Sequence, residues 1–286
     1  MVKSNIILII GQNKCNKLFE KSIEIYLSRN DITDIILVTY KNENIEFVKS
    51  NTSVKKILVP NKKFKLSAEY QKYLYDIGIK FIGDNYKEEN LFILKTRMDV
   101  CITKNQLDYV FSQNYKINLQ NNDSLDISTC TLFPHKVWVP WVHITNPFYI
   151  EDACFYSHIS IMRNLSPYIG NLFQHQGHSH VRWFLLLARE YNLYEEANTY
   201  NDYKNMNSKF ILNEITKNIL IKYGECIRKQ FIVKTLDGGI IFRRWNDINF
   251  YKKPSNNIVD IIDNKAISNL KIVYNNEDYY LIDLEA

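Results

Sequence analysis

The first part of the chain alternates between short apolar runs and segments whose apolar residues follow a helical period. The apolar runs cover residues 5–10, 34–39, 56–59 and 91–95. Runs of this length without a helical period are typical of buried strands. The segments between them predict amphipathic helices over 15–27, 43–50 and 66–77, the last of which should end near Gly78 or Gly83. Strands that alternate with helices predict a parallel sheet with right-handed crossovers.

This order of elements predicts an α/β fold of Rossmann type, with a mostly parallel sheet flanked by helices. Neither a GxGxxG after the first strand nor a GxxxxGK followed by Ser or Thr occurs, which disfavours a classical dinucleotide fold and a P-loop enzyme. In open α/β sheets, ligands bind beyond the carboxyl ends of the strands. We therefore expect Gly11, Gln12, Thr39 and Lys41, which follow the first two strands, to lie at the same edge as residues 95–99.

Three charged residues, Lys95, Arg97 and Asp99, stand where the fourth buried strand reaches the surface. They alternate along the chain, so on an extended backbone their side chains point to one side. Two cations and one carboxylate suit a diphosphate with its metal ion, because cations bind phosphate oxygens and a carboxylate binds the metal. A local ion pair at a solvated strand end explains the same residues equally well.

Residues 134–143 combine prolines and histidines with Trp138 and Trp141, and they predict an irregular, aromatic-walled segment. Aromatic faces with polar edges suit sugar rings. Both tryptophans would serve equally well as core anchors.

Two adjacent carboxylates, Glu151 and Asp152, precede the apolar run 153–156. Asp152 suits the N-cap or first turn of a helix, and it also suits a general base. The three histidines between residues 175 and 180 lack a nearby Cys, Asp or Glu to complete a metal site, so the start of a helix is the favoured interpretation.

After Gly224 the sequence pattern becomes typical of strands and turns. Two hairpins are predicted, one from 231–235 and 240–243 and one from 271–274 and 279–282. We therefore divide the chain into a main domain over 1–224 and a small β-rich C-terminal appendage over 225–286.

Net charge and cysteine content indicate which partners the protein could bind and in which cellular compartment it is expected. The net charge of +5 is modest and the lysines are scattered, whereas a nucleic-acid-binding protein concentrates its cations on one element. Such a charge is compatible with anionic nucleotides or with peripheral contact to an anionic membrane. The five cysteines form no CxxC pair, and no run of about 18 apolar residues occurs. We expect a cytoplasmic protein with reduced thiols that does not bind nucleic acid.

The segment Leu94-Lys95-Thr96-Arg97-Met98-Asp99 resembles the Lys-Thr-Arg-x-Asp signature of the WavE-type lipopolysaccharide-synthesis proteins, which are bacterial glycosyltransferases. The resemblance extends in order over roughly residues 5–190. Residues 9–12 resemble the family's first strand and Gly/Gln turn, and residues 35–39 its second strand. Residues 147–152, followed by Phe155-Tyr156, resemble its Pro-Phe-x-Ile-x-Asp element. The chain departs from the family at Ala153 and Ser157, where a Trp or Phe and then a Gly are usual.

The resemblance implies a GT-A-like nucleotide-sugar transferase, in which an Asp-x-Asp motif after a buried strand holds Mn²⁺ or Mg²⁺ on the donor diphosphate. Here Arg97 stands in place of the first acid, and Asp99 remains. Two alternatives follow: Asp99 holds the metal alone, or Lys95 and Arg97 replace part of the metal's charge. Either arrangement would stabilise the negative charge that develops on the leaving group.

The leading hypothesis is a glycosyltransferase of surface-polysaccharide synthesis that moves a sugar from a nucleotide donor to a glycan or lipid-linked acceptor. The alternatives are a nucleotidyl- or phospho-group transferase, and a non-catalytic carbohydrate-binding protein. Each candidate residue has an expected role: nucleotide binding for Gln12, Thr39 and Lys41; diphosphate binding for Lys95 and Arg97; metal, ribose or sugar binding for Asp99; and general base for Asp152 or, failing that, Glu151.

Overall fold

The computed structural model describes residues 3–13, 16–87, 89–113, 115, 135–140, 150, 152–167, 183, 230–233, 272–274 and 277–279. Several residues that the sequence analysis singled out lie outside these ranges: the histidines between 175 and 180, Trp141 and Glu151.

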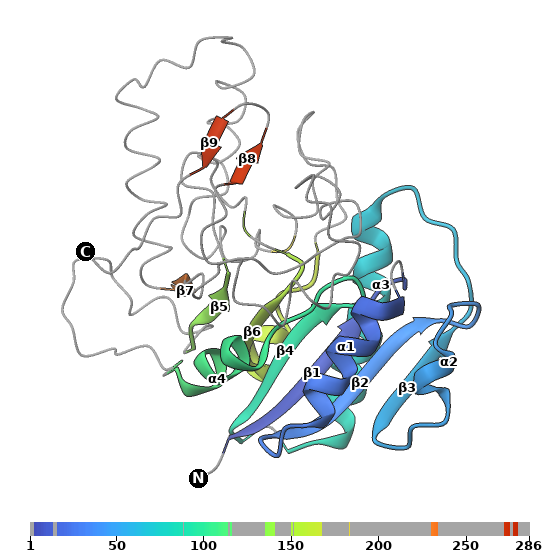
Figure 1. Cartoon of the computed structure of the whole chain (residues 1–286), viewed down its shortest axis with the longest axis horizontal. Helices are drawn as coiled ribbons and strands as arrows, with labels where there is room; N and C mark the ends of the chain where they lie inside the picture. Colours follow the sequence, from blue (N-terminus) through green and yellow to red (C-terminus); the bar gives the residue numbers. More distant parts are fainter. Residues whose placement is uncertain are drawn as a thin grey trace, which may run out of the picture.

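Seven strands of the described part of the chain form one mixed sheet (Figure 1). Its order is β3-β2-β1-β4-β6-β5-β7. Four strands, β1 to β4, run parallel to one another, and β6 runs antiparallel to β4. The bounds are Ser4–Ile10 (β1), Ile32–Tyr40 (β2), Val54–Val59 (β3), Leu91–Arg97 (β4), Val137–Val139 (β5), Phe155–His158 (β6) and Phe231–Val233 (β7). This confirms the predicted α/β class with a mostly parallel sheet.

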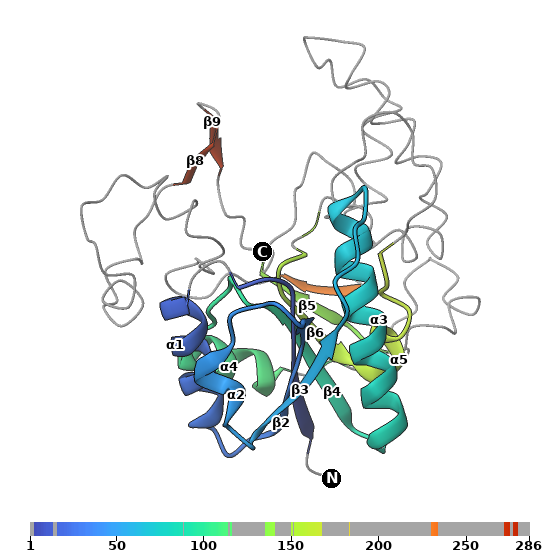
Figure 2. The same cartoon turned by 90° about the vertical axis from the view of Figure 1, so that its right-hand side faces the viewer.

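Helices cover both faces of the sheet, as the edge-on view in Figure 2 shows. On one side lie α1 (Asn16–Leu27), α2 (Glu46–Lys49) and α4 (Lys104–Ser112), and on the other lie α3 (Ser67–Asn85) and α5 (Ile159–Met162). The central strand shows why two layers form: Ile6, Leu8 and Ile10 pack toward α3, while Ile7 and Ile9 pack toward α1. Each of these side chains is at most 1% exposed, and full burial of one contributes about 1.5–3 kcal/mol.

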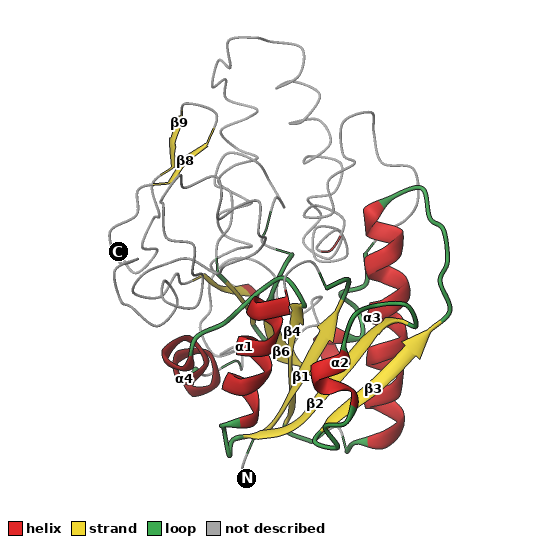
Figure 3. Ribbon diagram, turned by 45° about the vertical axis from the view of Figure 1, so that its right-hand side comes forward, coloured by secondary structure: helices red, strands yellow, loops and turns green. Residues whose placement is uncertain are grey.

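Helix α3, the longest in the described part of the chain, continues through both glycines at which the sequence predicted its end. Figure 3 shows it as one unbroken helix. At Gly78 an added Cβ would lie 2.5 Å from Leu8 Cδ1. The glycine therefore lets the helix approach the central strand closely, which is a packing role that the sequence pattern does not distinguish from a helix stop.

Two further predictions need correction. Residues 137–139, predicted as part of an irregular segment, form strand β5 within the sheet. Asp152, predicted as an N-cap or first-turn acid, precedes strand β6 rather than a helix. In both places the apolar side chains are buried on the sheet, and that tertiary burial overrides the local propensity.

The C-terminal part of the chain contributes strands in two places. β7 pairs in parallel with β5 at the edge of the main sheet, whereas the sequence predicted it as half of a hairpin with 240–243, which lie outside the described residues. β8 (Ile272–Tyr274) and β9 (Glu277–Tyr279) form the second predicted hairpin, with β9 starting two residues earlier than expected. The domain boundary at 224 stays a prediction.

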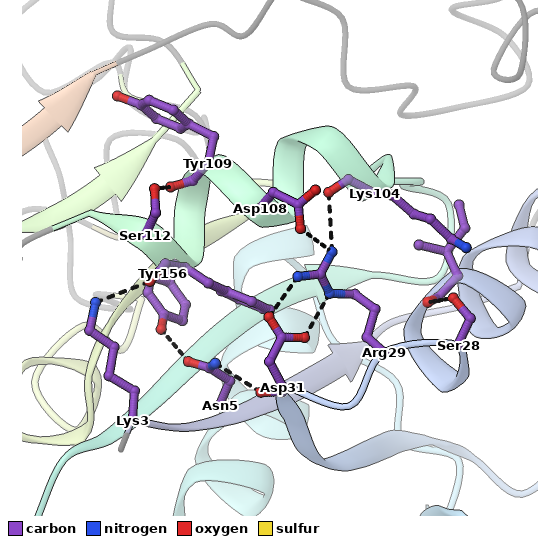
Figure 4. Close-up of polar contacts among 12 residues, drawn as sticks. Lys3, Asn5, Ser28, Arg29, Asp31, Lys104, Asp108, Tyr109, Ser112 and Tyr156 are labelled. Carbon is purple, nitrogen blue, oxygen red and sulfur yellow. Dashed lines mark hydrogen bonds and ion pairs between the residues drawn. The ribbon is translucent and has the colours of Figure 1, made fainter. Parts of the chain in front are cut away.

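Polar contacts tie the layers together at the amino ends of the parallel strands (Figure 4). Arg29 donates to both carboxylate oxygens of Asp31 at 2.8 and 2.6 Å and to Asp108 of α4 at 2.6 Å. Asn5 accepts a hydrogen bond from the Tyr156 hydroxyl and donates to the Asp31 carbonyl. This edge is therefore occupied by structural contacts.

No helix among the described residues is long and apolar enough to cross a membrane.

We expect Gly78→Ala to lower the free energy of unfolding by about 1–3 kcal/mol, because overpacking against the buried Leu8 outweighs the gain of roughly 1 kcal/mol in helix propensity. Gly83→Ala is the matched control, since its Cβ would meet only the end of the Arg163 side chain, at 2.7 Å from Nη2. That variant should stay within about 1 kcal/mol of the wild type. Urea unfolding measures both, and equal stabilities would contradict the packing role of Gly78.

Candidate functional site

The order of the strands places a topological switch point between β1 and β4. From β1 the chain continues to β2 on one side, and it later returns to β4 on the other side. Such a point is where open α/β sheets bind ligands, beyond the carboxyl ends of the strands. The residues that follow β1 and β4 are therefore the first candidates for a site.

The loop after β1 turns at Gly11, whose φ of 115° is a conformation that side-chain-bearing residues rarely adopt. The Thr39 hydroxyl, at the end of β2, donates to the Gly11 carbonyl oxygen at 2.7 Å. From the end of β4, the Met98 amide donates to the Ile10 carbonyl at 3.3 Å. These bonds confirm that the three loops meet at one edge of the sheet.

The candidate nucleotide-binding residues differ in exposure at this edge. Thr39 is fully buried and its hydroxyl supports the Gly11 turn, while Gln12 and Lys41 are exposed. The Lys41 backbone is fixed by a hydrogen bond of 3.0 Å to the Val59 carbonyl. Gln12 and Lys41 are thus the two that a ligand could reach directly.

At the end of β4, Arg97 forms a bidentate ion pair with Asp99. Arg97 Nε donates to Asp99 Oδ1 at 2.8 Å, and Nη2 donates to Oδ2 at 2.6 Å. The side chains are 13% and 3% exposed, so the pair is largely shielded from water. Planar two-point pairs of this kind are among the stronger charge-assisted interactions.

This pairing bears on the expected metal ion. Both carboxylate oxygens of Asp99 accept hydrogen bonds from Arg97, and the described residues contain no group of three or more His, Cys, Asp or Glu that could hold a metal. As they are arranged, these residues do not fit a metal centre. The expectation of Mn²⁺ or Mg²⁺ on Asp99 stays a prediction, and no catalytic step is derived through it.

Lys95 occupies a different environment from the one expected of a phosphate-binding side chain. It is fully buried, and its Nζ lies over the rings of Trp183, at 4.6 Å, and Phe155, at 5.1 Å. The ammonium also donates to the Asp152 carbonyl oxygen. The side chain therefore faces the α3 layer and joins β4 to the segment that precedes β6.

Burial lowers the pKa of Lys95 from 10.5 to about 7. The carboxylate of Asp152 counteracts this effect, the guanidinium of Arg97 adds to it, and Cys154 and Asp99 counteract it more weakly. These mutual influences show that the charged groups of β4 and of the 152–154 segment form one cluster. Burial raises the pKa of the Cys154 thiol, which makes it a poor nucleophile at neutral pH.

Asp152 is 1% exposed and contacts a residue of α3. Gln71 Nε2 donates to Asp152 Oδ2 at 3.4 Å, and Gln71 Oε1 accepts from the indole Nε1 of Trp183 at 3.0 Å. Neither Gln71 nor Trp183 is among the site residues predicted from the sequence. A single glutamine within a helical pattern and a tryptophan near residues 175–180 carry no signal that they meet.

Other aromatic and surface features lie apart from this cluster. Trp138 is 1% exposed and packs in the core, as the core-anchor alternative for it required. One surface hollow of about 340 Å³ is lined by residues of α3 and Arg163, and another of about 410 Å³ surrounds Arg29. Neither includes a residue of the candidate site.

No family model and no curated protein matches the sequence, so the resemblance to the WavE-type family stays a prediction. Among solved structures, the chain is similar to a 4-diphosphocytidyl-2C-methyl-D-erythritol synthase, with 9% identity and a TM-score of 0.40 over 87% of this chain and 98% of that one. It is also similar to the glycosyltransferase GlyE of Streptococcus pneumoniae TIGR4, with 10% identity and a TM-score of 0.37 over 84% of this chain and 46% of that one. Mouse xyloside xylosyltransferase 1 gives 9% identity and a TM-score of 0.35 over 82% and 85%. At these levels the chemistry of the site follows only from the residues of this chain.

The buried Lys95 should make stability depend on pH. Between pH 7 and 10.5 the native state releases a proton that the unfolded chain retains, so the free energy of unfolding rises with pH. Relative to Lys95→Met, the wild type should gain up to about 1.4 kcal/mol per pH unit in this window. Urea unfolding of both proteins between pH 7 and 9 measures the difference. Parallel pH profiles would show that Lys95 keeps an ordinary pKa.

Proposed function

We propose that the protein is a glycosyltransferase that moves a sugar from a nucleotide-diphosphate donor to a glycan or lipid-linked acceptor in bacterial surface-polysaccharide synthesis. The observation that carries the proposal is the Arg97–Asp99 pair at the switch point, beside the Gly11 turn. It combines a permanent positive charge with the edge at which α/β sheets bind ligands. The surface-polysaccharide pathway is the part of the proposal that rests on the sequence resemblance. The cytoplasmic location rests on the cysteine content, and contact with the inner membrane rests on the net charge of +5.

In this proposal the donor lies across the carboxyl ends of β1, β2 and β4. Gln12 and Lys41 contact the nucleotide, since both are exposed there. Thr39 acts indirectly, because its hydroxyl holds the Gly11 turn in place. Arg97 binds diphosphate oxygens, and its charge stabilises the negative charge that develops on the leaving nucleoside diphosphate.

Asp152 is the proposed general base of an inverting transfer. The acceptor oxygen forms a bond to the anomeric carbon while the bond from that carbon to the diphosphate oxygen breaks. The acceptor proton passes to the Asp152 carboxylate, and the electron pair of the broken bond leaves on the diphosphate. The contribution of Glu151 as a substitute base stays a prediction.

The competing functions make different predictions at the same site. A nucleotidyl- or phospho-group transferase could use the same edge, but sugar transfer releases a nucleoside diphosphate whereas nucleotidyl transfer releases pyrophosphate. A carbohydrate-binding protein needs an accessible aromatic face, and Trp138 does not supply one because it is buried.

A thermal-shift panel of UDP-, GDP-, CMP- and ADP-sugars, each with and without Mn²⁺, tests donor binding. At a concentration 100 times the dissociation constant, the matching donor should stabilise the protein by about 2.7 kcal/mol. Arg97→Lys keeps the charge but loses the two-point geometry, and we expect it to weaken donor binding roughly tenfold or more. Lys104→Met, at the opposite edge of the sheet, should leave the shift unchanged. No shift with any donor would argue against the proposal, and a shift that requires Mn²⁺ would assign the metal a role in donor binding.

Asp152→Asn should reduce turnover by about 10²- to 10⁴-fold while donor binding stays intact, because the amide keeps the shape of the side chain but cannot accept the proton. Release of nucleoside diphosphate, measured with the donor found in the panel, gives the rate. Wild-type turnover in this variant would remove Asp152 from the mechanism.

A further inference from the structure

The indole of Trp183 contacts both residues that hold Asp152. Its ring face lies 4.6 Å from Lys95 Nζ, and its Nε1 donates to Gln71 Oε1 at 3.0 Å. Lys95 in turn donates to the Asp152 carbonyl, and Gln71 donates to the Asp152 carboxylate. Backbone and side chain of Asp152 are thus both held by groups that depend on one tryptophan.

The hydrogen bond from Trp183 fixes the orientation of the Gln71 amide. An indole N–H can only donate, so it binds the oxygen end of the Gln71 amide. The nitrogen end of that amide then faces the Asp152 carboxylate, to which it donates. Without the indole N–H, the amide would lose the contact that fixes its orientation, and its oxygen could turn toward the carboxylate.

The ring of Trp183 is itself fixed by close packing. It is fully buried and makes edge contacts with Tyr75 and Phe155, with ring centroids 4.7 and 5.1 Å from that of Trp183. Gln71 and Tyr75 are four residues apart on α3 and therefore lie on the same face of that helix. The residues that contact Trp183 come from α3, β4 and β6, which are the elements that surround the candidate base.

We propose that Trp183 is a positioning residue which, through Gln71 and Lys95, fixes the backbone and the carboxylate of Asp152. This inference rests on the proposed function for its catalytic consequence, but the coupling between the four residues does not. In the native protein, Asp152 is held for proton transfer by a donor from α3 on its side chain and a donor from β4 on its backbone.

The first test does not need a substrate. The fluorescence of Trp183, taken as wild type minus Trp183→Phe, should change with pH as Lys95 loses its proton, in a transition near pH 7. Lys95→Met should abolish the transition, and Asp152→Asn should move it to lower pH, because the carboxylate raises the pKa of Lys95. Tyr115→Phe, which loses a buried hydrogen bond on the opposite face of the sheet, should leave it unchanged. A transition that persists in Lys95→Met, or that Asp152→Asn does not move, would overturn the proposal.

The second test uses turnover. Trp183→Phe and Gln71→Leu should each lower kcat about tenfold or more with little change in the KM for the donor, and the double variant should be no slower than the slower single variant, because the two residues act in series. Tyr115→Phe should keep the wild-type kcat. Additive losses in the double variant, or a wild-type kcat in Trp183→Phe, would overturn the positioning role. A wild type that transfers no sugar would instead count against the proposed function, while the fluorescence result would still decide whether Trp183, Lys95 and Asp152 are coupled.

Discussion

The antiparallel pairing of β6 with β4 brings the parts of the candidate site together. Its register places Phe155 opposite Lys95, so the three residues before Phe155 continue past the end of the ladder toward Arg97 and Asp99. Residues 57 positions apart in sequence thereby come within hydrogen-bonding distance, as the contact from Lys95 to the Asp152 carbonyl shows. A shift of one residue in this register would turn every β6 side chain to the other face of the sheet, because side chains alternate along a strand.

Lys95 and Arg97 lie on the same strand, but their different surroundings give them different charge states near pH 7. Arg97 stands at the end of β4 and keeps its charge beside Asp99, since a guanidinium does not lose its proton in proteins. Lys95 lies two residues earlier in β4 and is buried against aromatic rings. Burial lowers its pKa to about 7, so the amine can lose its proton near neutral pH. The strand therefore offers a permanent charge at the sheet edge and a titratable one beneath it, and only the first suits a diphosphate.

Much of the scaffold could be predicted from the sequence, because apolar periodicity reports directly on burial. The four parallel strands, the intervening helices and the shared edge of the Gly11 and Thr39 loops all follow from it. The errors have specific causes. Gly78 permits close helix–strand contact rather than ending α3, and the three-residue strand β5 is too short to show a period. The network around Asp152 depends on side-chain hydrogen bonds between distant segments, which leave no periodic trace.

In the proposed function, the Arg97–Asp99 pair would let a single acid serve where the sequence resemblance implies two. Arg97 would bring positive charge to the donor diphosphate, and Asp99 orients the guanidinium with two hydrogen bonds. A guanidinium has five N–H donors, so it can bind a phosphate oxygen while it stays paired with a carboxylate. In the proposed function the Asp99 carboxylate would therefore act on the donor through Arg97, and donor binding would depend on the orientation of that guanidinium.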